Sequence, residues 1–229
     1  TEAATSEAAS HSLPLTVTVL PAELTSPIVL DLNGDGVQTV DLKDTKGRFD
    51  LLNIGVAIRS GWLSSEDAFL AVDTNGNGRI DDRSELFGGR IGEGFEKLAG
   101  FDSNRDGVVD SRDARFSELK VWQDRNGNHQ TDLGELKSLY EAGIRGLSTR
   151  YRIVPEVQHG DVQGRTSPAG DRMSGVGNWL LERGQVTMAD GRTIQMADAY
   201  FETRPNASDN ASAGQQKGAS ITVRSEAPV

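Results

Sequence analysis

The sequence predicts an α+β fold in which short strands and helices are arranged around several EF-hand-like loops, with a β-hairpin near the C-terminus. Three observations support this fold class. Loops rich in Asp, Asn and Gly recur between residues 31 and 135, and most follow a short apolar run that is typical of a strand. Apolar residues at helical spacing precede one of these loops, at Phe95, Leu98 and Ala99. Asp190-Gly191 separates two alternating segments, which indicates a hairpin with a type I′ turn over residues 186–196.

The loop from Asp102 to Asp113 has the complete pattern of an EF-hand calcium loop. Calcium requires roughly six to eight hard oxygen ligands around one point, so the chain has to wrap around the ion. Gly107 stands at position 6, where the sharp bend requires a positive φ that glycine adopts at little cost. The predicted ligands stand at positions 1, 3, 5, 7, 9 and 12, with position 7 acting through its backbone carbonyl: Asp102, Asn104, Asp106, Val108, Asp110 and Asp113.

Three further segments repeat this pattern with departures. In the second loop the acidic closing residue arrives one position late, so we expect a slightly widened loop around the ion. In the fourth, His129 stands where glycine is preferred, which costs about 1–3 kcal/mol of strain. The first has no acid at position 12, so that Asp41 or the distant Asp67 has to close it. The predicted ligands are Asp31, Asn33, Asp35, Val37 and Thr39 in the first loop; Asp73, Asn75, Asn77, Arg79, Asp81 and Glu85 in the second; and Asp124, Asn126, Asn128, Gln130, Asp132 and Glu135 in the fourth.

The other elements follow from periodicity and composition. Between the first and second loops, Leu52 and Ile54 stand at ligand positions of a similar segment, which predicts a packed loop without metal. Only the third loop has predicted helices on both sides and so looks like a full EF-hand. Strands are expected at residues 13–20, 26–30, 68–72, 119–123, 147–154 and 199–201, short helices at 84–87, 95–99, 116–119 and 136–140, and a mobile loop at 156–175.

Composition and charge narrow the class of protein. The chain has 229 residues, a formal net charge of -10 and no cysteine. Such an acidic chain is a poor nucleic-acid ligand, and bound calcium would offset most of its self-repulsion, so we expect folding and metal binding to be coupled. No apolar run is long enough for a transmembrane helix. Millimolar extracellular calcium would fill even weak loops, which favours an extracellular location.

The order of these motifs resembles the calcium-dependent modules of bacterial RTX exoproteins. The resemblance rests on Pro27 to Gly36, on Asp73 to Asp81 followed by Glu85-Leu86-Phe87-Gly88, and on the segments Phe101-Asp102-Ser103-Asn104 and Val121-Trp122-Gln123-Asp124. It covers roughly residues 26–201. Two kinds of module share this order of motifs. One cuts an Asp-Pro bond just before its first loop. The other, from large adhesins, captures the free C-terminal ends of peptides.

The residue before Pro27 distinguishes these two kinds of module. Self-processing requires an aspartate carboxylate to attack its own peptide carbonyl, with the proline nitrogen leaving. Here that residue is Ser26, and no Asp-Pro dipeptide occurs in the chain. The resemblance therefore favours a binding module over a self-cleaving one, and we expect no enzyme activity. A structural spacer stiffened by calcium is the remaining alternative.

The resemblance implies a calcium-dependent ligand-binding module of a large secreted or surface adhesin that mediates cell adhesion and biofilm formation. Type I secretion, Ca²⁺ as the cofactor, and a peptide or protein C-terminus or a glycan on another cell surface as the ligand are expected. No membrane insertion is expected. Arg165, Arg172, Trp179 and Tyr200 are candidates for the walls of the ligand site. The expected organisation is a linker and a strand of a preceding module at 1–25, the binding domain at 26–203 as a monomeric module of a longer chain, and a flexible linker at 204–229.

Overall fold

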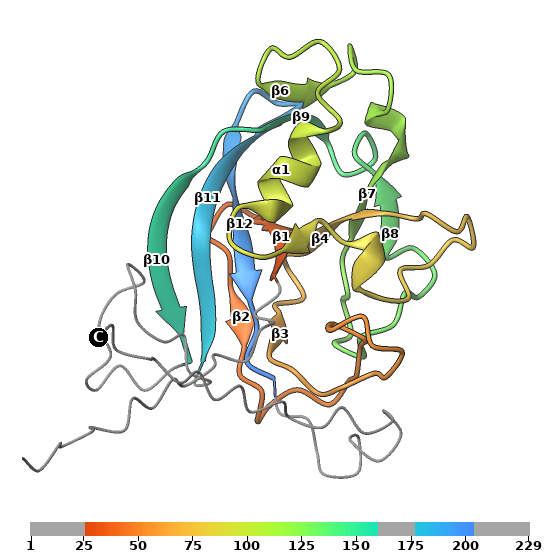
Figure 1. The fold of residues 1–229 in the computed structure, drawn as a ribbon, viewed down its shortest axis with the longest axis vertical. Helices are drawn as coiled ribbons and strands as arrows, with labels where there is room; N and C mark the ends of the chain where they lie inside the picture. The colour runs from red at the N-terminus through yellow and green to blue at the C-terminus, as the bar shows by residue number, and fades with distance from the viewer. Residues whose placement is uncertain (1–25, 160–176, 204–229) are drawn as a thin grey trace, which may run out of the picture.

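A long antiparallel sheet dominates the computed structural model, which describes residues 26–159 and 177–203 (Figure 1). The expected strand at 13–20, the linkers, and most of the expected mobile loop at 156–175 lie outside the described residues. The elements, in chain order, are β1 (Ser26–Leu30), β2 (Thr39–Val40), β3 (Trp62–Leu63), β4 (Ala68–Val72), the 3-10 turn η1 (Arg83–Glu85), β5 (Gly88–Gly89), α1 (Glu93–Ala99), β6 (Val108–Asp110), the 3-10 turn η2 (Phe116–Glu118), β7 (Leu119–Trp122), β8 (Leu136–Ser138), β9 (Ile144–Ser148), β10 (Arg152–Gln158), β11 (Asn178–Met188) and β12 (Thr193–Tyr200).

The predicted α+β class is wrong, because the described residues form mostly β-structure with a single α-helix, α1. The helices expected at 84–87 and 116–119 are single 3-10 turns, so the third loop is not a full EF-hand. The helix expected at 136–140 is instead strand β8 followed by turns. Its residues pair with β7, from Lys120↔Ser138 to Trp122↔Leu136, and this tertiary pairing outweighs a short helical pattern of apolar residues.

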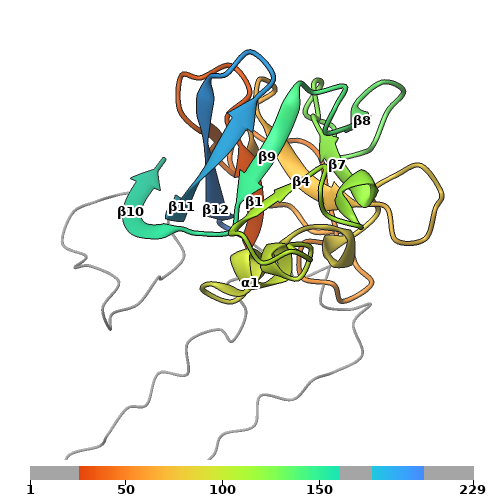
Figure 2. The same cartoon turned by 90° about the horizontal axis from the view of Figure 1, so that it is seen from above.

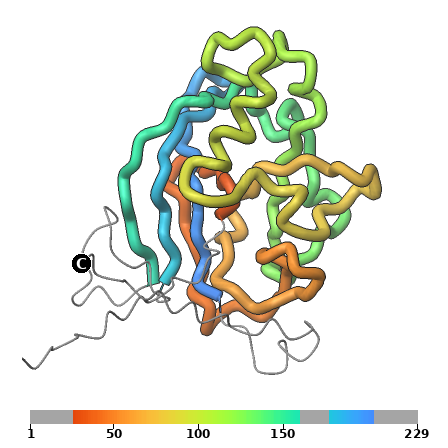
Figure 3. The backbone as a smooth tube through the Cα atoms, in the orientation of Figure 1, coloured from red at the N-terminus to blue at the C-terminus, as the bar shows by residue number. Residues whose placement is uncertain are grey.

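Strand β1 lies at the centre of the large sheet. The strand order is β6-β9-β11-β12-β1-β4-β7-β8, with β10 beside β11 and β5 beside β1. The register between β1 and β12 includes Ile28↔Asp198 and Leu30↔Met196, so the first and last described strands are neighbours, as the tube in Figure 3 shows. The sheet therefore brings the first and last strands of the described chain together. The loops that follow β1, β4 and β7 begin at strands that pair with one another.

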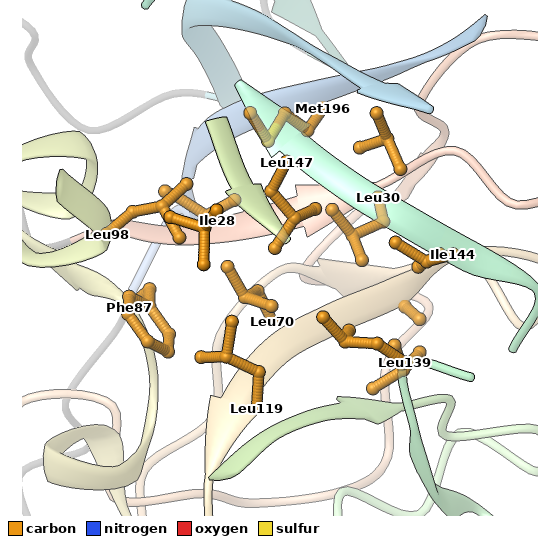
Figure 4. Close-up of a cluster of buried hydrophobic side chains, with 14 of the residues drawn as sticks. Ile28, Leu30, Leu70, Phe87, Leu98, Leu119, Leu139, Ile144, Leu147 and Met196 are labelled. Atoms are coloured by element: carbon orange, nitrogen blue, oxygen red, sulfur yellow. The ribbon is translucent and has the colours of Figure 1, made fainter. Parts of the chain in front are cut away.

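Both faces of the central strands are buried, and alternate residues enter two separate cores. Ile28 and Leu30 join one cluster with Leu70, which lies beneath α1 and β9 (Figure 4). Val29 and Phe69 point the other way, into a second cluster that includes two tryptophans. Burial on both faces explains why β1 and β4 are continuous apolar runs without polar alternation.

The strand expected at 147–154 is two strands that follow one another along β11. β9 pairs with the C-terminal half of β11, and β10 with its N-terminal half (Figure 2). The strand also continues through Pro155, where a register shift lies between Ile153 and Glu156. The β11–β12 hairpin is confirmed, but its turn is not type I′, since Gly191 has a positive φ and Asp190 does not. No helix among the described residues is long and apolar enough to cross a bilayer.

Candidate metal centres

The third loop folds back on its own carboxylates through backbone N–H groups. Asp102 accepts hydrogen bonds from the N–H groups of Asp106, at 3.2 Å, and Gly107, at 2.9 Å. The Asn104 side-chain oxygen accepts from Asp106 N–H at 2.9 Å. Gly107 has a φ of 92°, the bend that the sequence predicts at position 6. These contacts hold the oxygens of positions 1, 3 and 5 on the inside of one turn.

The residue that closes the third loop is fixed from two sides. One oxygen of Asp113 accepts from Ser103 N–H at 2.8 Å, and the other from Asp110 N–H at 2.9 Å. Burial tends to raise the pKa of Asp113, but the backbone N–H of Asp110, the Ser103 hydroxyl and further N–H groups outweigh it and lower the pKa. The carboxylate is therefore held in its charged form at the position where a bidentate ligand is needed.

Glu85 and Glu135 occupy the same place in the second and fourth loops. Glu85 accepts from Thr74 N–H at 3.0 Å and, through its other oxygen, from Asp81 N–H at 2.9 Å. Glu135 accepts from the N–H groups of Arg125 and Asp132 at 2.9 and 3.0 Å. The one-residue delay of Glu85 is therefore absorbed by the turn η1, and its carboxylate meets loop positions 2 and 9 as in the other two loops.

Asp67, not Asp41, closes the first loop. Asp31 accepts from Gly34 N–H at 2.7 Å and from Gly36 N–H at 3.0 Å, as the first residue of a calcium loop does. Asp67 accepts from Gln38 N–H at 2.7 Å, so a residue just before β4 takes the role that position 12 has elsewhere. Burial raises the pKa of Asp67 to about 7, and repulsion from the carboxylates of the loop adds to this. Asp41 is turned toward Lys43 at 2.9 Å instead.

Two predicted ligands of the first loop, Val37 and Thr39, are hydrogen-bonded to β10. The Val37 carbonyl accepts from the Gln158 side-chain amide at 2.9 Å. Thr39 donates its N–H and its hydroxyl to the Gln158 side-chain oxygen, at 2.9 and 2.8 Å. This loop thus brings together Asp31, Asn33 and Asp35 but directs the Thr39 side chain away, because Thr39 belongs to β2.

The segment after β2 copies the backbone of these loops without their side-chain donors. Asp50 accepts from Ile54 N–H at 2.9 Å and from Gly55 N–H at 2.6 Å, the contacts that Asp102 makes in the third loop. Leu51 is buried, whereas Ile54 is 49% exposed, so only part of this loop packs against the core. The prediction of a packed loop is therefore correct for its first half only.

Counter-charges and amide groups compensate the carboxylates at position 9. Asp110 pairs with Arg112 at 2.6 Å, and this contact lowers the pKa of Asp110. Asp132 accepts from the side-chain amides of Asn126 and Asn128, both at 2.8 Å, which lower its pKa in the same way. All of these oxygens therefore carry charge near neutral pH and lie at the mouths of their loops.

The second and fourth loops are joined at position 8, a contact that the sequence analysis missed. Ile80 N–H donates to the Thr131 hydroxyl at 2.9 Å. The two residues stand at equivalent positions of their loops, and that shared position is the signal that could have found the pair. The Thr131 hydroxyl also donates to the Ile80 carbonyl at 3.4 Å, so two hydrogen bonds connect the loops and changes in one can be transmitted to the other.

A buried tryptophan holds the first carboxylate of the fourth loop. Trp62 donates its indole N–H to Asp124 at 2.8 Å, and His129 N–H donates to the same oxygen at 2.8 Å. The two rings stack with centroids 3.8 Å apart. His129 has a φ of 64°, as expected for position 6, and its burial lowers its pKa to about 4. A neutral imidazole packed on Trp62 thus replaces the usual glycine, and Trp62 itself had no sequence signal.

The donor chemistry of the four loops fits a hard divalent cation. Carboxylate, amide and carbonyl oxygens are the ligands that calcium prefers. Within residues 26–159 and 177–203, no three Asp, Glu, His or Cys side chains form a ready-made metal cluster. Each loop instead mixes carboxylates with Asn oxygens and backbone carbonyls, which is the composition of an EF-hand loop and differs from that of a zinc site.

The match to a known family covers most of the described chain. The model of the SPM domain matches residues 28–202. The chain belongs to the SPM domain family. The iron-regulated protein FrpA of Neisseria meningitidis serogroup C is 37% identical to it over 181 residues, which are 75% of this chain and 15% of that protein. The SPM domain therefore spans a small part of the length of this relative.

The residue before Pro27 in this SPM domain lies in a buried acidic cluster. Ser26 is fully buried in β1. Glu182, Asp198 and Tyr200 are buried nearby, and the Tyr200 hydroxyl donates to Glu182 at 3.3 Å. Burial raises the pKa of Asp198 well above its usual value, the Ser26 hydroxyl opposes this, and Glu182 adds to it. Of the four residues predicted to form the walls of a ligand site, Tyr200 is an interior residue, which contradicts that prediction. Trp179 is half-buried on β11. Arg165 and Arg172 lie outside the described residues.

Proposed function

We propose that the chain is a calcium-dependent ligand-binding module of a secreted or surface-attached bacterial protein, with a peptide C-terminus as the preferred ligand class. The observation that carries this proposal is the common placement of four closing carboxylates. Asp67, Glu85, Asp113 and Glu135 each accept backbone N–H groups of their loops. Such placement gathers carboxylates beside other oxygen donors, an arrangement that is costly unless a cation neutralises it.

Calcium would be held by the side-chain oxygens of loop positions 1, 3 and 5, the carbonyl of position 7, and the closing carboxylate. The ion would supply the positive charge that links the loops to the sheet. Since the first, second and fourth loops follow β1, β4 and β7 and the third contains β6, metal binding would stabilise the strands on which both cores depend. The protein residues would then act as a scaffold that keeps surface segments rigid, which lowers the entropy lost on ligand capture.

Substitution of the closing residues tests calcium binding directly. Calorimetric titration of Glu135→Gln and Asp113→Asn with calcium should each show the loss of one binding event. Glu118→Gln is a matched control, because Glu118 pairs with Arg115 at 2.7 Å on the surface, outside the loops. Equal titration curves for all three variants and the unmodified chain would contradict the assignment of the closing residues.

A secreted location and a role in adhesion rest on the resemblance of the motif order to RTX exoproteins. The physics of the loops supports the same location, since weak loops fill only at extracellular calcium concentrations. Fractionation of producing cells with and without calcium, followed by detection of the full-length protein that contains this chain, tests the location. Recovery only from the cytosol would contradict it.

Self-cleavage before Pro27 is the alternative that family resemblance suggests. Glu182, Asp198 and Tyr200 are buried around that bond, but Ser26 has no carboxylate with which to form a cyclic anhydride. We therefore predict that the chain remains intact in millimolar calcium. Mass spectrometry after incubation should return the full mass, and a fragment that begins at Pro27 would overturn this prediction.

A further inference from the structure

A groove of about 920 Å³ lies where β10, β11 and β12 meet the third loop. Its floor is one face of the sheet, with Arg183 on β11 and Gln195 on β12, and its rim includes Gly107 and Tyr151. Figure 1 shows β10 and β11 side by side along this edge of the molecule, with β6 near the end of β9. The third metal loop borders this groove at Asp106, Gly107 and Val108, and the first contacts β10 at Gln158, next to the lining residue Glu156.

Three arginines line the groove together with two carboxylates, of which Asp106 pairs with Arg112 outside the lining. Arg152 and Arg183 are direct partners in the register of β10 and β11, so their side chains share one face of the sheet. Like charges directly opposite each other in a sheet are destabilising unless an anion lies between them. Glu156 pairs with Arg183 at 2.5 Å, but no described residue forms an ion pair with Arg152 or with Arg150 at the rim. On a chain with a net charge of -10, two uncompensated guanidinium groups in one groove indicate an anionic partner.

Arg183 also has an unused donor. Its side chain is 10% exposed, and it donates to the Gln195 side-chain oxygen at 2.7 Å and to Glu156. The Nε atom is buried and has no hydrogen-bond partner among residues 26–159 and 177–203. A buried guanidinium donor without a partner is costly, and an incoming carboxylate oxygen could satisfy it.

Backbone hydrogen bonds connect the groove to the third loop. Thr149 N–H donates to the Gly107 carbonyl at 3.0 Å, and β6 pairs with β9 immediately beside this contact. A Cβ atom on Gly107 would lie 3.3 Å from Nε of Arg150, which places that guanidinium against the bend of the loop. Order in the third loop therefore determines the position of the segment that carries Arg150 and Arg152.

We propose that this groove binds a carboxylate of an extended peptide, with Arg150 and Arg152 as the primary contacts and Arg183 as the buried base of the site. The inference rests on the proposed function and identifies where on the chain its ligand binds. A single guanidinium group can bind a carboxylate through two parallel hydrogen bonds, and a second adds a further charge-assisted contact. The exposed side chain of Val154 and the ring of Tyr151, which is 40% exposed, offer apolar contact to the residues that precede the carboxylate.

The ligand contacts the face of the sheet and does not extend its edge. β10 has described pairing on one side only, to β11, yet it contains Pro155, which lacks an N–H donor. A register shift between Ile153 and Glu156 further disrupts the edge. Proline and irregular register are features that protect edge strands from the addition of another strand. Recognition therefore depends on the side chains of the groove.

Fluorescence anisotropy with a library of dye-labelled, N-acetylated hexapeptides tests the proposal. The first set has free C-termini, the second has amidated C-termini without acidic residues, and the third has amidated C-termini with one internal Asp. Binding by the first set alone identifies the α-carboxylate as the ligand group, and binding by the first and third identifies any carboxylate. Equal binding by the second set, or no binding by any set in millimolar calcium, would overturn the proposal.

Matched variants locate the site. Arg150→Gln and Arg152→Gln should each weaken binding about tenfold, since each removes a charge-assisted hydrogen bond. Arg152→Lys should recover part of this loss, because it restores the charge without the planar fork. Arg192→Gln is the control, because Arg192 is exposed in the β11–β12 turn and pairs with Asp190. If both groove variants bind as tightly as the control, the groove is not the site.

Melting curves separate this proposal from the one on which it rests. A chain that is stabilised by calcium but binds no carboxylate peptide contradicts the groove alone. A chain that calcium does not stabilise contradicts the proposed function, and peptide binding that persists in chelator would then show that the groove works without metal. The groove variants should melt within about 2 °C of the unmodified chain in calcium, because their side chains are exposed.

Discussion

The first and third loops place similar carboxylates in similar turns, yet they are closed in different ways. In the third loop, Asp102 and Asp113 lie within one continuous segment, and the hydrogen bonds that their carboxylates accept span ten residues or fewer. The loop also joins the sheet, through the pairing of β6 with β9 and the hydrogen bond from Thr149 N–H to the Gly107 carbonyl. In the first loop, Asp31 organises the turn locally, but Asp67 reaches Gln38 across 29 residues.

A metal loop can therefore be completed by a residue from a distant segment as well as by a residue of its own segment. A loop closed by its own residues can form its donor set before the rest of the chain is folded. A loop closed by Asp67 requires β4 to be in place beside β1, since Asp67 directly precedes that strand. The third loop should therefore bind metal with less dependence on the state of the sheet.

Removal of calcium is the strongest test of this comparison. Excess chelator should lower the melting temperature by roughly 10–20 °C if at least two loops are filled at about a hundred times their dissociation constants. The measurement is a melting curve with and without chelator, at matched ionic strength to remove the effect of screening. Identical curves would mean that neither kind of loop holds metal.

Loss of the first carboxylate should weaken the third loop more than the first. Asp102→Ala should reduce the free energy of unfolding in calcium by about 3 kcal/mol, through loss of a fully equipped site. Asp31→Ala should reduce it by less, because the first loop has fewer side-chain donors, with Thr39 committed to Gln158. Calorimetric calcium titration and denaturant unfolding of both variants test the order, and equal losses would remove the distinction between the loops.

Trp62→Phe shows how far a locally closed loop still depends on the fold. The fourth loop is closed by Glu135 within its own segment, but Trp62 donates to Asp124 from β3. Loss of this hydrogen bond to a carboxylate should cost about 1.5–3 kcal/mol. Trp122→Phe is the matched control, because Trp122 is equally buried and its indole N–H has no partner in the described part of the chain. Calcium affinity should fall in the first variant and not in the second.

Asp67→Asn gives the most selective test of closure across the sheet. It should weaken one calcium site and leave the others unchanged, because Asp67 contacts the first loop only among the four loops. Asp41→Asn should have no such effect, since Asp41 pairs with the exposed Lys43. Site-resolved calcium titration by NMR would distinguish the two variants. An equal loss in both, or none in either, would contradict closure by Asp67.

The loops and the strands that lead into them can be located from local sequence alone. Oxygen-bearing side chains at fixed spacing, with residues that accept positive φ at position 6, specify a turn through contacts that span only a few residues. For that reason the turns at Asp31, Asp73, Asp102 and Asp124 were predicted at the correct residues. The strands β1 and β4 were predicted for a similar reason, because burial on both faces leaves a continuous apolar run. β7 was also predicted, from apolar residues interrupted by Lys120.

The fold class, the closing residue of the first loop and the position of the groove depend on contacts between distant segments. The segment at 136–140 has an apolar spacing that fits a helix, but β7 supplies hydrogen-bond partners that make it a strand. Asp67, Trp62 and Arg152 contact partners that are far away in the sequence, and no local spacing encodes such contacts. The geometry of a single loop depends on dihedral preferences and short-range hydrogen bonds. The closure of the first loop by Asp67 and the formation of the groove depend on which strands become neighbours, and the burial of the two cores decides that.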